Sequence, residues 1–177
     1  MLAAKHKVDQ CGDQPASLLV AQGDNNLVLG TKATGAGFYE RPTVKNGHLR
    51  LLVVDADVRV WDSVFQMLQS DLSELICEVS IDGLGKVLLS NAPFDVILID
   101  VYRPVQKFLE LPSLIKAIAP RTEVVFISRF FDQALRTRSL QSGAYECLPK
   151  AVDENELRKA ILNAVDQNGR SWSLFCL

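Results

Sequence analysis

The sequence predicts an α/β fold, in which a parallel β-sheet is covered by helices on both faces. From about residue 49 onward, strand-like and helix-like segments alternate five times. One strand-like segment, FDVILID at 94–100, is apolar on both faces, as a central parallel strand requires. Right-handed crossovers between such segments give a doubly wound, three-layer sandwich.

The first two strand and helix pairs are expected between residues 49 and 93. The first strand is LRLLVV at 49–54, and four large apolar residues at helical spacing follow it. These residues are Val58, Trp61, Phe65 and Leu68. A short second strand is expected at about 75–79. Asp82 and Gly83 are typical of the start of a second helix, and the Asn-Ala-Pro segment at 91–93 ends it.

The third strand, at 94–100, is followed by a loop that contains Pro104 and by a helix over residues 114–118. Pro120 ends this helix, because proline cannot continue a helical hydrogen-bond ladder. The fourth strand is expected to be EVVFIS at 123–128.

A helix at about 131–141 follows the fourth strand and stops before Gly143, a residue typical of helix ends. A short fifth strand then ends at Leu148. The last helix is predicted from apolar residues that share one face. These residues are Leu157, Ile161 and Val165.

Residues 49–167 are expected to form one domain, since a chain of 177 residues with 48% hydrophobic content can bury one core. Residues 1–48 are often interrupted by Gly, Asn, Asp, Thr and Pro. They are predicted to be a flexible extension or a small hairpin, in which SLLVAQ and NLVLG flank a turn at 23–26. Residues 168–177 are predicted to be a C-terminal tail.

Composition and charge argue against several functional classes. A net charge of -2 provides no basic field for nucleic acid, and no apolar run reaches the roughly 18 residues of a membrane span. The N-terminal residues lack the apolar stretch of a signal peptide, so we expect a cytoplasmic protein without a membrane partner. The four cysteines are scattered and only two histidines are present, which predicts neither a zinc site nor a disulfide framework.

Four of the predicted strands are followed by, or end in, polar residues that suit phosphoryl chemistry. These residues are Asp55, Asp100, Ser128 and Lys150. The carboxyl ends of parallel strands meet at one edge of a sheet, where ligands bind. Carboxylates hold Mg²⁺ and one of them can attack phosphorus, while a hydroxyl and an ammonium can bind phosphoryl oxygens. The sequence therefore predicts an acidic phosphoryl-transfer pocket.

These segments resemble a response-regulator receiver domain, the phosphoacceptor module of two-component signalling, from about residue 49 to 165. The matching pieces are LLVVD, FDVILID with Pro104 four residues later, VVFIS and GAYECLPK. The resemblance implies a flavodoxin-like, five-stranded parallel sheet in the order 2-1-3-4-5. It also implies a sensor histidine kinase or another signalling protein as partner, and a homodimer through the face built from the fourth helix, fifth strand and fifth helix.

The same resemblance implies a role for each strand-end residue. Asp100 would be the phosphoacceptor, Ser128 the switch hydroxyl and Lys150 the phosphoryl-binding ammonium. The implied Mg²⁺ ligands are Asp55, Asp100, the backbone carbonyl of Tyr102 and, through a water or a shifted loop, Asp57.

Several positions depart from the family pattern. Ala56 replaces the second acid after the first strand, which should weaken Mg²⁺ binding because that cation needs near-ideal octahedral oxygen coordination. Arg129 replaces a small residue after the switch hydroxyl, and its guanidinium is a candidate plug over Asp100 and Asp55. Cys147 replaces the customary aromatic switch residue and is expected to be a small buried hydrophobe.

Two functional interpretations follow. The departures favour a degenerate pseudo-receiver that works as a protein-interaction module, and the intact Asp100, Ser128 and Lys150 favour a conventional Mg²⁺-dependent phosphoacceptor. Neither is an enzyme, and a flavin or nucleotide enzyme fits poorly because the acidic loop would repel a cofactor phosphate. Each residue also has a purely structural interpretation: a solvated strand-end carboxylate, a serine that satisfies the backbone, or an arginine that points to water.

Overall fold

A computed structural model of the chain describes residues 32–34, 38–41, 48–91 and 93–167. Its five parallel strands are β3 (Leu49–Val54), β4 (Leu72–Glu78), β5 (Val96–Asp100), β6 (Glu123–Ser128) and β7 (Glu146–Pro149). They lie side by side as β4-β3-β5-β6-β7, which is the predicted order 2-1-3-4-5. The predicted flavodoxin-like fold is therefore confirmed.

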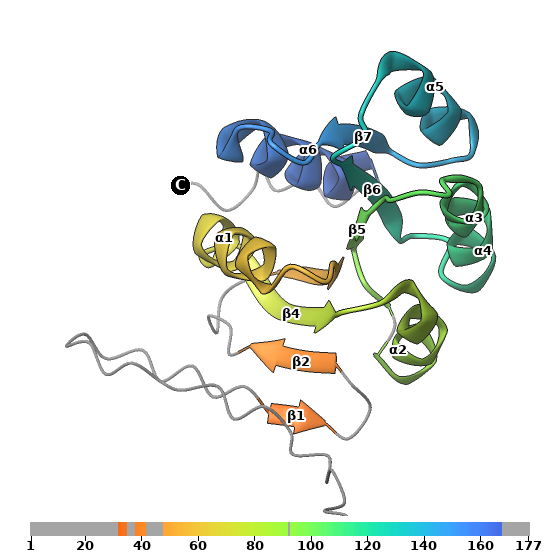
Figure 1. The fold of residues 1–177 in the computed structure, drawn as a ribbon. Helices are drawn as coiled ribbons and strands as arrows, with labels where there is room; N and C mark the ends of the chain where they lie inside the picture. Colours follow the sequence, from red (N-terminus) through yellow and green to blue (C-terminus); the bar gives the residue numbers. More distant parts are fainter. Residues whose placement is uncertain (1–31, 35–37, 42–47, 92, 168–177) are drawn as a thin grey trace, which may run out of the picture.

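Helices cover both faces of this sheet (Figure 1). They are α1 (Val58–Leu68), α2 (Leu84–Asn91), α3 (Gln106–Leu109), α4 (Leu111–Ile118), α5 (Gln133–Gln141) and α6 (Glu154–Gln167), with a 3₁₀ turn at Ile81–Gly83 before α2. Helices α1 and α6 pack on one face, and α2 to α5 pack on the other. Within the described ranges, no helix is both long and apolar enough to cross a membrane.

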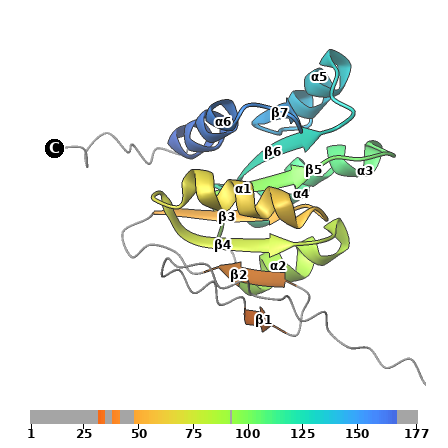
Figure 2. The same ribbon diagram turned by 60° about the vertical axis from the view of Figure 1, so that its left-hand side comes forward.

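Two short antiparallel strands extend the sheet beyond the five predicted ones (Figure 2). These are β1 (Lys32–Thr34) and β2 (Phe38–Arg41), and β2 pairs with β4 so that Phe38 lies opposite Glu78. The hairpin expected around residues 23–26 and the tail at 168–177 both lie outside the described residues. The boundary between residues 48 and 49 stays a prediction.

The core forms two layers because successive residues of each strand face opposite sides of the sheet. In β3, Leu51 and Val53 pack toward α1 and α6, whereas Leu52 and Val54 pack toward α2. All four side chains are fully or almost fully buried. Between their first residues and their ends such strands are almost entirely apolar, so the polar groups that face a ligand gather at the carboxyl ends of the strands.

Glu78, at the end of β4, is a buried carboxylate that lies against Gly83. Its side chain is 3% exposed, and its Oε1 accepts a hydrogen bond from the Ser80 N–H at 3.2 Å. Its Oε2 is buried and accepts no hydrogen bond within the described part of the chain. A Cβ atom added at Gly83 would overlap this carboxylate, so any larger residue there requires the end of the Glu78 side chain to move.

We expect Gly83→Ala to lower the free energy of unfolding by about 1–3 kcal/mol, because the new methyl group must displace a buried carboxylate. Urea denaturation of the four proteins in a double-mutant cycle with Glu78→Ala measures this effect. In the Glu78→Ala background the same glycine substitution should cost much less. Equal costs in the two backgrounds would show that the overlap with Glu78 is not the cause.

Candidate functional site

The four strand-end residues predicted from the sequence lie at one edge of the sheet. Asp55 directly follows β3, Asp100 ends β5, Ser128 ends β6 and Lys150 directly follows β7. The register of the parallel strands aligns their ends, since Asp100 pairs with Ile127 and Ser128 pairs with Pro149. Topology therefore brings together residues that are up to 95 positions apart.

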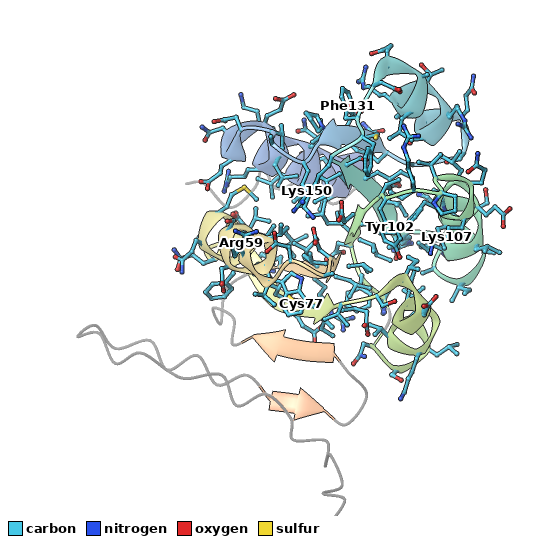
Figure 3. The ribbon with its side chains drawn as sticks, in the orientation of Figure 1. Arg59, Cys77, Tyr102, Lys107, Phe131 and Lys150 are labelled. Carbon is cyan, nitrogen blue, oxygen red and sulfur yellow. The ribbon has the colours of Figure 1, made fainter. Side chains whose placement is uncertain are left out.

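Lys150 places its ammonium group between the two carboxylates. Its Nζ lies 2.7 Å from Oδ2 and 2.9 Å from Oδ1 of Asp55, and 2.8 Å from Oδ2 of Asp100. The side chain of Lys150 is 10% exposed, that of Asp55 1% and that of Asp100 19%. Lys150 comes from the end of β7 and reaches toward β3 and β5 (Figure 3). One cation thus serves two carboxylates in a largely dry site.

The carboxylate of Asp55 is deeply embedded in the protein. Burial raises its pKa, although the hydrogen bond from Lys150 and that from the Asp57 N–H, at 2.8 Å, oppose the shift. The indole N–H of Trp61 donates to the Asp55 carbonyl at 2.9 Å and fixes the backbone there. Desolvation is the largest effect on Asp55, so its charged form depends on a nearby cation.

Ser128 uses its hydroxyl to join two loops. The hydroxyl donates to the carbonyl of Val101 at 2.7 Å and accepts a hydrogen bond from the N–H of Phe130 at 3.0 Å. The residue is 1% exposed. In this arrangement the hydroxyl satisfies the backbone, as the structural interpretation of this serine expects, and it holds the loop after β5 against the loop after β6.

Asp57 caps helix α1 and is held by arginines. It accepts hydrogen bonds from the N–H of Arg59 at 3.1 Å and from the Arg59 guanidinium at 2.9 and 2.8 Å. These contacts lower the pKa of Asp57 to about 2. The guanidinium of Arg129 lies 3.6 Å from the same carboxylate, and its side chain is 67% exposed. In this arrangement the cation between Asp55 and Asp100 is Lys150, whereas Arg129 pairs with Asp57.

Sequence reasoning did not identify the contribution of Arg59. The signal was present, because an aspartate that precedes a helix and an arginine two residues later can cap the helix and form an ion pair at its first turn. This pairing occupies both oxygens of Asp57, the carboxylate expected to reach a metal in place of the missing second acid.

The donor atoms at this edge suit a hard cation only in part. Asp55 and Asp100 are the kind of oxygen ligands that Mg²⁺ prefers, although Oδ2 of Asp55 already lies 2.7 Å from the Lys150 ammonium. However, the described residues contain no group of three His, Cys, Asp or Glu side chains able to hold a metal. The ring of Tyr102, whose backbone carbonyl is an expected ligand, forms a T-shaped contact with the ring of Phe108, with the ring centres 4.7 Å apart.

Cys147 is fully buried in the core layer beneath α5. Burial raises the pKa of its thiol. A reactive thiol needs an exposed, electropositive setting, so this residue fits the expected small buried hydrophobe.

Comparisons with known proteins agree with this architecture. The family model described as response regulator receiver domain matches residues 51–162. A stretch of 81 residues is 32% identical to the response regulator protein PilR of Pseudomonas aeruginosa, and it covers 46% of this chain but only 18% of PilR.

Two solved structures have a similar fold. One is a response regulator from Thermotoga maritima, with a TM-score of 0.60 and 21% identity over 67% of this chain and 98% of the other. The second is the beryllofluoride-activated NtrC4 receiver domain dimer, with a TM-score of 0.60 and 23% identity over 67% of this chain and 98% of the other. At these identities the likeness concerns the fold alone.

We expect Lys150→Met to lower the free energy of unfolding at pH 7 by about 3 kcal/mol, because it leaves two close carboxylates without their shared cation. Urea denaturation measures the change, with Lys159→Met on the exposed surface of α6 as the matched control. Adding Asp55→Asn and Asp100→Asn to Lys150→Met should restore part of the loss. A loss no larger than that of the control would contradict the shared-cation interpretation.

The pH dependence of stability should report the capping carboxylate. Because the pKa of Asp57 falls from 3.8 to about 2 in the folded protein, its contribution is present above pH 3.8 and is lost as the pH falls toward about 2. Asp57→Ser keeps a cap oxygen but removes this titration. The stability difference between wild type and Asp57→Ser should therefore shrink as the pH falls from 3.8 to about 2, and it should also shrink at high salt. Urea denaturation measures both effects. A difference that is independent of pH would exclude this role for Asp57.

Proposed function

Because the chain belongs to the response regulator receiver domain family, which acts in two-component phosphorelay signalling, we propose that it is a degenerate receiver that docks onto other proteins without needing phosphorylation. In this proposal the fold is a rigid recognition module whose state is set by its partner. It is a signalling module and not an enzyme.

This proposal rests on how the charged side chains at the strand ends are paired. The two carboxylates at the strand ends already share the ammonium of Lys150, and the carboxylate expected to assist them, Asp57, is paired with Arg59 and Arg129. A divalent cation would have to displace the Lys150 ammonium and would then gain only two carboxylate ligands. Both effects weaken Mg²⁺ binding, on which phosphoryl transfer to an aspartate depends.

The alternative is a conventional phosphoacceptor, and the partial exposure of Asp100 favours it. With 19% of its side chain exposed, Asp100 is the most accessible member of the charged triad. An oxygen of its carboxylate would attack the phosphorus of a phosphohistidine in a histidine kinase, forming a P–O bond as the P–N bond breaks. Asp55, Asp100 and the Tyr102 carbonyl would hold Mg²⁺, which would neutralise the phosphoryl charge, while Ser128 and Lys150 would bind phosphoryl oxygens.

Partners belong to the same proposal. A sensor histidine kinase or another signalling protein is the expected partner, and neither nucleic acid nor a membrane is expected. A homodimer is expected through the face formed by α5, β7 and α6. These elements are the fourth helix, fifth strand and fifth helix of the family's fold. The cytoplasmic location expected from the sequence also stays a proposal.

We expect wild-type protein to show no saturable NMR shift changes with Mg²⁺ at about millimolar concentration, with or without a beryllium fluoride phosphoryl mimic. Ala56→Asp should gain binding, because it restores a carboxylate beside Asp55, and adding Arg129→Ala should increase the affinity further if that guanidinium competes for the site. Ala117→Asp, which adds the same charge on the exposed surface of α4, is the matched control.

Saturable binding by the wild-type protein that disappears in Asp100→Asn would overturn the pseudo-receiver proposal and establish the phosphoacceptor. Equal gains from Ala56→Asp and Ala117→Asp would show that the added charge acts nonspecifically.

A further inference from the structure

A groove of about 550 Å³ lies beside the charged site, between the loop after β5 and helix α5. Its lining includes Arg103, Val105 and Phe130 on one side and Leu135 and Arg138 of α5 on the other. Asp55, Asp100 and Lys150 do not line it. We propose that this groove binds an acidic peptide segment of a partner protein, with one apolar or aromatic side chain as its anchor. This inference rests on the proposed docking function and names the class of partner.

The charges of the groove favour an anionic ligand. The guanidinium of Arg103 lies 5.2 Å from the centre of the Phe130 ring, and neither Arg103 nor Arg138 forms an ion pair within the described residues. By contrast Arg136, on the same helix, forms a bidentate pair with Glu146 at 2.9 and 2.8 Å. Two arginines with uncommitted donors are suited to carboxylates.

The acid in the lining, Asp132, forms no ion pair with either arginine in the described residues and leaves the lining with an excess of one positive charge. Asp132 is the N-cap of α5, and its Oδ1 accepts a hydrogen bond from the Leu135 N–H at 2.6 Å. Its carboxylate therefore serves the first turn of the helix. The net charge of the whole chain, -2, opposes an extended polyanion such as nucleic acid, so a short acidic segment fits better.

The shape of the groove favours a peptide over an engulfed small molecule. Among its apolar lining residues Leu135 is 5% exposed, whereas Phe130 is 49% exposed, so the groove is open on its aromatic side. A small-molecule pocket normally encloses most of its ligand, whereas peptides lie in open grooves with side-chain anchors. Exposed aromatic and arginine side chains are also the residues most enriched at protein interfaces.

Ser128 connects the groove to the charged site. Its hydroxyl bonds the carbonyl of Val101, two residues before Arg103, and the N–H of Phe130. This pair of hydrogen bonds fixes the two chain segments that carry the stacked Arg103 and Phe130 side chains. Any event at the strand ends that draws the Ser128 hydroxyl away would change the spacing of these two side chains.

The test is selection of a phage-displayed library of random peptides, about twelve residues long, on the full chain. We expect the enriched peptides to be acidic with one large apolar residue. Their affinity should fall at least about tenfold in Arg103→Glu/Arg138→Glu, because the charges of the groove are reversed. The matched control is Lys86→Glu/Lys159→Glu, which makes the same charge change on exposed parts of α2 and α6 and should bind as wild type. Ser128→Ala should weaken binding without removing it.

Enrichment of peptides without acidic residues, the absence of any enrichment, or an equal loss in the two double variants would each overturn the proposal. Equally strong competition by a random single-stranded oligonucleotide or by anionic lipid vesicles would also overturn it, because a general attraction for anions would then explain the binding. The substitutions spare Asp55, Asp100 and Lys150, so Mg²⁺ and beryllium fluoride binding can be measured on the same variants. A result that overturns peptide binding by the groove can thus be distinguished from a result that overturns the proposed function.

Discussion

Burial of the parallel strands on both faces is the constraint on which the rest of this structure depends. Helices cover both sides of β3, β5 and β6, and nearly every side chain between the strand ends is inaccessible. Unpaired charges are too costly in such an interior. The ends of the strands are therefore the places where carboxylates, a hydroxyl and an ammonium can gather, and the loops after the strands decide how these groups meet.

In the proposed function, competition between two kinds of cation sets the chemistry at that edge. The Lys150 ammonium contacts Asp55 and Asp100 at a small entropic cost, because the end of β7 holds this side chain beside them. A divalent cation carries twice the charge but must shed water and find enough oxygen ligands. Asp57 would be the natural additional ligand, yet it is paired with Arg59. In the proposed function, the fold is retained while its affinity for metal falls.

The sequence predicted the sheet order and the gathering of Asp55, Asp100, Ser128 and Lys150 well, because apolar runs and strand-end residues are local signals and the resemblance supplied the strand order. It offered backbone bonding by Ser128 only as one of two interpretations and could not predict that Arg129 faces Asp57, because these contacts depend on rotamers and loop positions. The pair formed by β1 and β2 was also not predicted, since strands of three and four residues give too little periodicity.

The added hairpin changes how the sheet can associate. Without it, β4 would be an outer strand of seven residues, long enough to pair with a strand of another molecule. With it, the outermost strands in the described residues are β1, of three residues, and β7, of four, which ends in a proline. Such short edges are poor templates for intermolecular strand addition. Within the described residues, the sheet therefore offers little edge for intermolecular strand addition, which favours helices, loops and side-chain faces as the surfaces for contact with other molecules.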